Sequence, residues 1–332
     1  PWTRHFVFST IVISKEEGAM KVMTGPRPEN RVRSTCSYIW RNKYLYLLML
    51  PGIVLLLVFK YAPMYGILMA FKDFSFRDGI LGSPWNDFAH FKRLFASPDF
   101  YNVLKNSIVL NVLKIVFCFP IPIILAVMLN EIRYKRFKKI TQTAVYLPYF
   151  ISWVVLVSIT TNLLSTNGGL VNELLKSLGI EPIMFLGKSE WFRPLIVITT
   201  IWKDTGWNTI VYLAALTAID QSLYEAAMVD GASHIQRILH ITLPGIAATI
   251  VVLLILTVGK AMENGFEQMF LFQNSVNMQV SDVFETYTYR VGMVMGEFAY
   301  ATAVGLFKAI VGFILVVGSN KLANMMGQKG IY

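Results

Sequence analysis

The sequence predicts an all-α, polytopic membrane protein with six transmembrane helices, and three observations lead to this fold class. Of its 332 residues, 55% are hydrophobic and only 15% are charged, whereas a soluble domain has roughly a quarter charged residues. The mean hydropathy is +0.53. The apolar residues form six separate stretches, each of about the 20 residues needed to cross the membrane hydrocarbon.

These stretches are the expected membrane spans. In chain order they are 44–71, 107–129, 143–164, 194–219, 244–264 and 300–322. They make one membrane domain, 44–322, between a cytoplasmic N-terminal tail, 1–43, and a short C-terminal tail, 323–332. The apolar run 6–14 is too short to span a bilayer, so the stretch before Arg33 is expected to be a flexible tail.

The basic residues predict the orientation. The formal net charge is +10, and Lys and Arg gather before the first stretch and after the second, as the positive-inside rule expects of cytoplasmic loops. With an even number of spans, both termini face the cytoplasm and the chain lies in a bacterial inner membrane. This placement accounts for the charge, so a nucleic-acid partner is not expected. Cys36 and Cys118 form no disulfide framework or metal pattern.

The loop between the fourth and fifth stretches, 222–243, is the most informative segment. It is expected in the cytoplasm and reads SLYEAAMVDGASHIQRILHITL. Ser222 stands three residues before Glu225, and Ser233 three before Gln236. Each pair fits a capping box, in which two side chains satisfy free amides at a helix start. The loop therefore predicts two short helices.

The residues between and after these caps define a compact cytoplasmic knob. Asp230 and Gly231 supply a turn, since glycine accepts the positive φ of a helix C-terminus. Ala226 and Ala227 offer a small-residue surface against which another protein can pack closely. Pro244 suits the first turn of the fifth span.

This loop resembles the EAA signature of permease subunits of binding-protein-dependent ABC importers. The spacing is Glu225, Ala226, Ala227, three residues, Gly231, nine residues, Ile241, one residue, Leu243 and Pro244. The resemblance implies a type I ABC importer permease fold whose two short helices sit in a cleft of the ATP-binding subunit, with Glu225 making a polar contact there. The implied coupling residues are Glu225, Ala226, Ala227, Asp230, Gly231 and Pro244. Glu225 could instead only cap its helix, and Gly231 only make a turn; docking is compatible with both.

The resemblance extends from about Tyr44 to the C-terminus. Residues 85–106 look like an outer loop of the sugar-permease branch that includes the maltose and glycerol-phosphate importers, and 282–317 resemble its polysaccharide-type permeases, which import pectin-derived and alginate-derived oligosaccharides. The implied partners are an extracytoplasmic solute-binding protein, a second permease subunit in a heterodimer, and two ATP-binding subunits that hold ATP and Mg. The sequence has no GxxxxGK[ST] loop, so neither an ATPase site nor a cofactor of its own is expected.

Ionisable residues inside spans usually face a cavity or a partner. Lys203 lies roughly 14 Å into the fourth span, near the midplane. Lys203 and its neighbour Asp204 either contact substrate or pair locally with another span. Lys114, Lys260 and Lys308 add positive charge or snorkel to the headgroups. The basic excess suggests an acidic, uronate-type oligosaccharide. The candidate pathway residues are Trp153, Asn162, Lys203, Asp204, Trp207, Asn208, Tyr212, Lys260, Glu263 and Asn264.

Other functions fit less well. An ion-coupled secondary transporter is the main alternative, but no clear internal repeat is present and a docking loop would be superfluous. A membrane enzyme would need catalytic groups, yet the four histidines form no metal-binding pattern. Nothing resembles the selectivity filter of a channel.

Overall fold

The computed structural model describes residues 40–325 and 327. Within this range it shows helices and loops and no strand, apart from an isolated antiparallel bridge between Lys72 and Trp85. The prediction of an all-α fold is confirmed. Residues 1–39, on which most of the predicted N-terminal tail falls, lie outside the described part. The chain divides into two units, Pro1–Tyr65 and Gly66–Tyr332.

The first predicted span is a single helical stretch of 29 residues, Lys43–Phe71. It consists of α2 (Lys43–Leu56), a π-helical turn η1 (Leu57–Tyr61) and η2 (Ala62–Phe71). None of its apolar side chains in α2 and η1 is buried. In water such exposure would be unfavourable, whereas lipid is a suitable surrounding.

The second and sixth predicted spans are also continuous helices. The second runs over Pro98–Glu131, 34 residues, through α5 (Pro98–Leu113), η3 (Lys114–Cys118) and α6 (Pro120–Glu131). It begins nine residues before the predicted start at 107, because Pro98 and Asp99 favour the first turn of a helix. The sixth is α18, Phe298–Met325.

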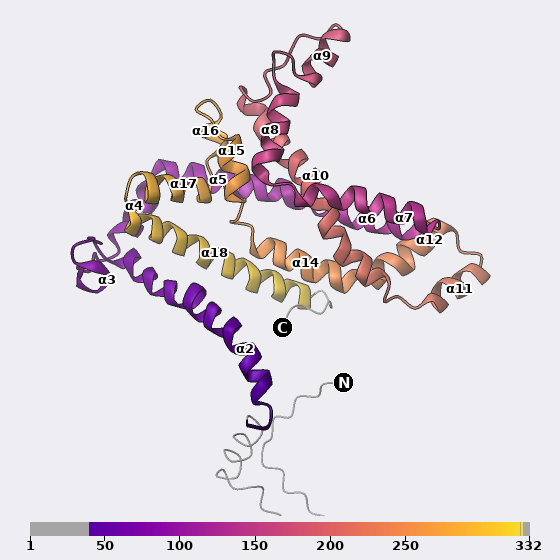
Figure 1. The fold of residues 1–332 in the computed structure, drawn as a ribbon, viewed down its shortest axis with the longest axis horizontal. Coiled ribbons are helices and arrows are strands. Elements are labelled where there is room, and N and C mark those ends of the chain that lie inside the picture. Colours follow the sequence, from indigo (N-terminus) through magenta and orange to yellow (C-terminus); the bar gives the residue numbers. More distant parts are fainter. Residues whose placement is uncertain (1–39, 326, 328–332) are drawn as a thin grey trace, which may run out of the picture. The chain divides into compact units, whose positions relative to one another are not determined.

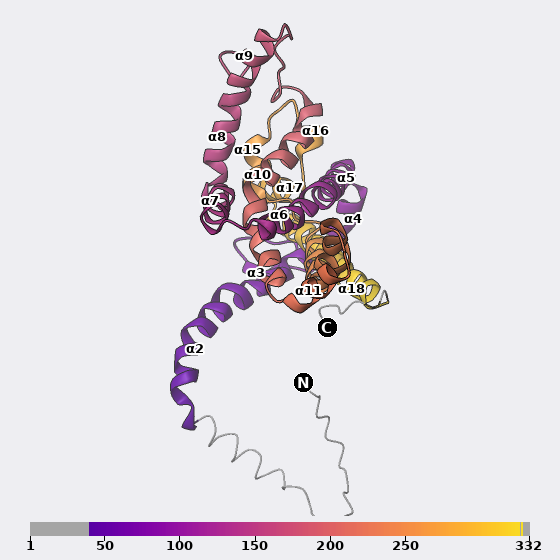
Figure 2. The ribbon, with the colours of Figure 1, turned by 90° about the vertical axis from the view of Figure 1, so that its right-hand side faces the viewer.

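The third predicted span, 143–164, is wrong as a single helix. Here α7 (Lys135–Tyr146) and the 3-10 turn η4 (Leu147–Phe150) meet α8 (Trp153–Leu164) at an angle of 99°. Pro148 lacks an amide hydrogen and disfavours a continuous helix. Ser152 then starts a new helix, because its hydroxyl accepts the Val155 amide. Figures 1 and 2 both show α8 projecting from this bend, with α9 (Leu170–Ser177) beyond it.

The fifth predicted span, 244–264, is also corrected. A helical segment, His234–Gly245, bends by 59° into α14 (Ala247–Gly259). The segment comprises α12 (His234–Arg237), η5 (Ile238–Thr242) and α13 (Leu243–Gly245). Residues 260–264 follow the helix as a loop.

The fourth predicted span corresponds to α10, Ser189–Leu216, which has 28 residues and is about 42 Å long. It carries more polar residues than the other spans. By length and composition, the described residues contain three helices that could cross a membrane, or up to five if each bent pair is one span. A count of six spans requires α10 in addition to these five, and it stays a prediction.

Short helices connect these segments in the second unit. They are α3 (Gly79–Gly82), α4 (Ala89–Ala96), α11 (Gln221–Val229), α15 (Phe266–Phe272), α16 (Met278–Ser281) and α17 (Phe284–Tyr289), which continues as η6 (Arg290–Val294). Helices α10 and α6 pack together, as do α14 and α18. An added Cβ at Gly312 of α18 would lie 3.1 Å from the Gly259 carbonyl oxygen of α14, so these two backbones approach closely.

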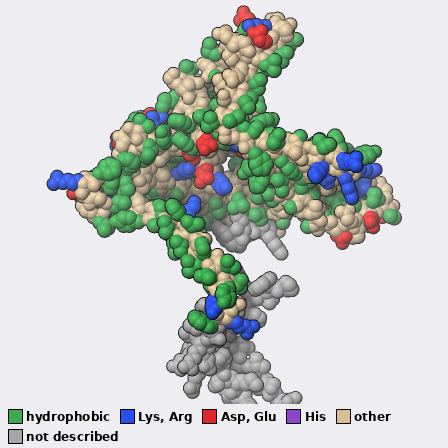
Figure 3. Space-filling view, viewed as in Figure 1, with side chains coloured by type: hydrophobic (Ala, Val, Ile, Leu, Met, Phe, Trp, Pro, Cys, Tyr) green, Lys and Arg blue, Asp and Glu red, His purple; other side chains and the backbone are tan. Residues whose placement is uncertain are grey.

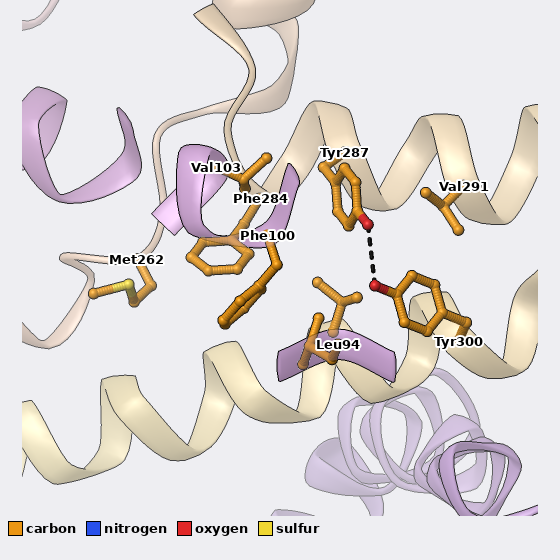
Figure 4. Packing of buried hydrophobic residues seen from close by; sticks show 9 residues of the cluster. Leu94, Phe100, Val103, Met262, Phe284, Tyr287, Val291 and Tyr300 are labelled. Carbon is orange, nitrogen blue, oxygen red and sulfur yellow. Dashed lines mark hydrogen bonds between the residues drawn. The ribbon is translucent and has the colours of Figure 1, made fainter. Parts of the chain in front are cut away.

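Two buried clusters determine where the functional segments lie. Figure 4 shows the first, in which Phe100 and Phe284 pack together and the Tyr287 and Tyr300 hydroxyls lie 3.1 Å apart. It joins α4, α5, α17 and α18. The second consists of Ala126, Tyr212, Leu216 and Ile246, and it holds α6 and α10 against the start of α14, next to the loop 222–243.

Candidate functional site

The first candidate site is the loop 222–243, and its first helix begins differently from the prediction. The cap of α11 is Asp220, whose Oδ1 accepts the Ser222 amide at 2.9 Å, so the predicted capping box of Ser222 and Glu225 is wrong. This hydrogen bond lowers the pKa of Asp220 below its usual value. In the described part of the chain Glu225 makes no hydrogen bond or ion pair, which leaves its carboxylate available to another protein.

The predicted turn and the second cap are confirmed. Gly231 has φ +78°, and the Ala232 amide donates to the Ala227 carbonyl at 2.9 Å, as at a glycine-terminated helix. Ser233 and Gln236 form a reciprocal capping box. Pro244 lies in the first turn of α13, three residues before α14 begins.

We expect Ser233→Ala to destabilise the second helix of this loop by about 1 kcal/mol, because one helix amide loses its acceptor. Amide hydrogen exchange over residues 234–238 should then accelerate by roughly fivefold. Ser222→Ala is the matched control, since Asp220 caps the first helix. Equal acceleration of the two helix starts would contradict this assignment.

Two contacts that the sequence did not suggest hold the loop in place. The hydroxyls of Tyr224 in α11 and Thr242 in η5 lie 2.9 Å apart. His234 Nε2 lies 3.6 Å from a carboxylate oxygen of Glu131, the last residue of α6. Around these contacts the loop exposes apolar side chains, of which Val229 is 88% exposed. A fixed knob with exposed apolar residues is typical of a protein-docking surface.

The second candidate site comprises the ten predicted pathway residues, which the structure does not gather into one cluster. Asn162 is exposed near the end of α8, and Asp204 is half-buried in α10. The others fall into three groups: at the bend before α8 (Trp153, Lys203, Trp207), at a small cavity (Asn208, Tyr212), and in the loop after α14 (Lys260, Glu263, Asn264).

The first group is organised by Lys203, which is 8% exposed. Its Nζ donates to the carbonyl oxygen of Tyr149 at 2.7 Å and to that of Ile151. It also lies 5.5 Å from the ring centroids of Tyr149 and of Trp153. Of the two alternatives left open by the sequence, this geometry supports local pairing.

The loop after α14 joins a buried polar network. Asn264 Oδ1 accepts from Asn111 Nδ2 at 3.0 Å, and the Asn264 carbonyl accepts from Lys114 Nζ at 2.8 Å. Lys114 Nζ also lies 3.4 Å from Gln268 Oε1, and Gln268 donates to Thr200 Oγ1 at 3.0 Å. Asn111, Gln268 and Thr200 could not be picked out from the sequence, because each is a single polar residue without a motif. Lys114 lies inside the helix packing and does not snorkel.

Beside this network is a cavity of about 170 Å³. It lies between η3, α6, α10 and α14, and its lining residues are Lys114, Cys118, Phe119, Pro122, Asn208, Val211, Tyr212, Leu253 and Thr257. Hydrogen-bonding groups from three elements and two aromatic rings therefore converge on a space enclosed by apolar side chains. This composition is common in small-molecule sites.

A larger groove of about 890 Å³ lies between α14, α17 and α18. Lys308 Nζ in this groove lies 2.6 Å from Glu285 Oε1, so Lys308 is neutralised and does not snorkel. Glu263 also lines the groove, whereas Lys260 is exposed outside it. Figure 3 shows acidic and basic side chains together on the face over these elements, surrounded by hydrophobic ones.

The sequence model of the family described as "Binding-protein-dependent transport system inner membrane component" matches residues 119–324. The chain is 50% identical over 306 residues to the polygalacturonan/rhamnogalacturonan transport system permease protein YteP of Bacillus subtilis (strain 168), covering 92% of this chain and 95% of YteP. It is 49% identical to the protein LplB of the same organism, covering 88% of this chain and 92% of LplB.

Two solved structures are similar throughout. One is a bacterial ABC transporter involved in the import of the acidic polysaccharide alginate; the TM-score is 0.82 and the identity 40%, over 89% of this chain and 100% of that chain. The other is a bacterial alginate ABC transporter in complex with an alginate pentasaccharide-bound periplasmic protein. The TM-score is 0.81 and the identity 40%, over 89% of this chain and 99% of that chain.

Proposed function

Because this chain belongs to the family of binding-protein-dependent transport system inner membrane components, we propose that it forms half of the membrane pathway of an importer for acidic oligosaccharides. As a permease it is a transport component of the inner membrane. Its relatives are ABC permeases for sugars and polysaccharides, which speaks against the ion-coupled secondary transporter considered from the sequence.

The proposed complex has five subunits. This chain pairs with a second permease subunit, two ATP-binding subunits bind ATP and Mg, and an extracytoplasmic binding protein delivers the sugar. The absence of a GxxxxGK[ST] loop from the sequence supports assigning ATP hydrolysis to partners. The basic helix α7 belongs to the same end of the second unit as α11 and α12 (Figures 1 and 3), which supports a cytoplasmic position for the coupling loop. The proposed cytoplasmic position of both termini rests on the even number of predicted spans.

In this complex the knob around Glu225 receives the motion of the ATP-binding subunits. Their closure on ATP would push on α11 and exchange inward for outward access, while the loaded binding protein favours the outward state. Such a two-state system responds to each ligand by its differential affinity for the two states. The exposed carboxylate of Glu225 and the apolar surface around it are the features that carry this assignment.

The preference for an acidic sugar rests on Lys114. An ammonium group has three donors, and two of them reach Asn264 and Gln268. No ion pair in the described residues includes Lys114. Its charge and one donor therefore remain for a ligand in the adjoining cavity, where Asn208 and Thr257 can bond to hydroxyls and the Tyr212 ring can contact a sugar face. A uronate carboxylate fits this arrangement.

We expect Lys114→Met to reduce uptake of an oligogalacturonate by about tenfold, the value of one charged hydrogen bond. The methyl ester of the same oligosaccharide, which is neutral, should lose less than threefold. The measurement is uptake into liposomes containing the complex, each form being delivered by the same binding protein and normalised to the wild type. Lys114→Arg should restore part of the uptake, and Lys105→Met, an exposed lysine on the same helix, is the matched control. Equal losses for both forms would contradict the charge preference.

A further inference from the structure

Three residues on one face of α10 hold the bend between α7 and α8. Lys203, Gly206 and Trp207 are spaced three and four residues apart, so they share a face of the helix. Each contacts the segment 145–153 from the neighbouring span. Through these three residues, this face of α10 contacts the bend between α7 and α8.

Lys203 supplies the polar part of the contact. The 3-10 turn η4 ends at Phe150, and the carbonyls around its end would otherwise lack partners in a low-dielectric surrounding. Lys203 Nζ donates to two of them, those of Tyr149 and Ile151. A buried ammonium that bonds to two carbonyls on either side of a break fixes the direction in which the chain leaves it.

Gly206 and Trp207 supply the packing. A Cβ added to Gly206 would lie 2.1 Å from the Val145 carbonyl oxygen and 3.0 Å from the Tyr146 Cα, so only glycine permits this approach of α10 to the α7 backbone. The Trp207 and Tyr149 rings are stacked, with centroids 4.6 Å apart and an interplanar angle of 8°.

Helix α10 also leads directly to the coupling loop. It ends at Leu216, and Asp220 then caps α11, the helix that carries Glu225. Leu216 and Tyr212 are buried in one cluster with Ile246, so the end of α10 is packed at the base of the loop. A displacement of the loop is thus transmitted to α10 through a short, packed connection.

We propose that Lys203, Gly206 and Trp207 form a clamp that makes α10 and the bend before α8 move as one body, so that motion of the coupling loop reaches the third span. Lys203 is then a positioning residue that acts through the bend, and it does not contact the sugar. Rigid elements that shift together are a common means of carrying motion between distant sites. The transport role of the clamp rests on the proposed function, but its structural role does not.

The structural test is amide hydrogen exchange of the purified complex over residues 147–152. We expect Lys203→Met to accelerate exchange there by about tenfold, since the loss of a charged hydrogen bond loosens the turn. Lys203→Arg should reverse most of the change, because its guanidinium can also donate to carbonyls. Lys105→Met and Gly318→Ala are matched controls; an added Cβ at Gly318 meets nothing within 4 Å. Unchanged exchange in Lys203→Met would overturn the clamp.

The functional test uses the same variants in liposomes. Lys203→Met and Gly206→Ala should keep basal ATP hydrolysis and lose about tenfold of the stimulation by loaded binding protein, equally for an oligogalacturonate and its neutral methyl ester. Loss for the acidic form only in Lys203→Met, with Gly206→Ala unaffected, would overturn the proposal in favour of direct sugar contact. If the wild-type complex shows no stimulation, the proposed function fails, and the exchange measurement still decides on the clamp.

Discussion

Replacing Glu225 with lysine should reduce binding-protein-stimulated ATP hydrolysis and sugar uptake by at least about 30-fold. Charged groups at the centre of a protein interface cost about 2 kcal/mol or more when one partner is removed, and charge reversal adds repulsion. Glu225 makes no hydrogen bond or ion pair within the described part of its own chain, so this loss would arise at the interface with the ATP-binding subunit. The measurement is ATPase activity and uptake of the reconstituted complex, with co-purification of the ATP-binding subunits as a direct test of docking.

Two further variants sharpen this prediction. Glu225→Gln keeps the shape and removes the charge, and it should fall between the wild type and Glu225→Lys. Glu181→Lys reverses an exposed carboxylate in the loop before α10 and is the matched control, with activity near that of the wild type. Full co-purification and full stimulation in Glu225→Lys would show that the loop does not dock through this residue.

The largest effect on stability is expected for Phe284→Ala. Phe284 is 0% exposed, and its ring packs against Phe100 and Phe307, with centroids 6.1 Å away in both cases. Removing a buried aromatic ring costs about 3 kcal/mol through lost contacts and the cavity that remains. For a chain of this size the thermal midpoint should drop by roughly 4 °C.

The thermal midpoint can be measured as the temperature at which half of the monodisperse complex in detergent has been lost. Phe137→Ala is the matched control, because Phe137 lies on α7 and is 59% exposed; its midpoint should change by less than 2 °C. A drop of similar size in both variants would mean that the cluster in Figure 4 contributes no more to stability than a surface ring does.

Local sequence signals predicted local structure well. Gly231 and the pair Ser233–Gln236 act over a few residues, and the turn and the cap lie where these residues require them. The long apolar stretches of the first, second and sixth spans likewise form continuous helices. The first cap was misassigned because Asp220 and Ser222 are both good capping residues, and which one caps depends on where α10 ends.

The bends and the interior contacts could not be predicted, because they depend on residues far apart in the chain. Pro148 favours a break, but at the 99° bend the carbonyls are bonded by Lys203, which lies more than 50 residues later. From the sequence, Lys114 looks like a lysine near a helix end. In the structure, the loop with Asn264 folds against it. Lys308 has no partner that the sequence reveals, because Glu285, which pairs with it, lies outside the predicted spans.

The proposed function of this permease is to move an acidic oligosaccharide at the expense of ATP hydrolysed by its partners. The most direct measurement is simultaneous uptake and ATP hydrolysis in liposomes containing the purified complex, with and without a binding protein loaded with oligogalacturonate. We predict that loaded binding protein stimulates both, and that neither is stimulated when the binding protein or the ATP-binding subunits are omitted. Uptake by this chain without ATP or partners would instead identify an ion-coupled secondary transporter.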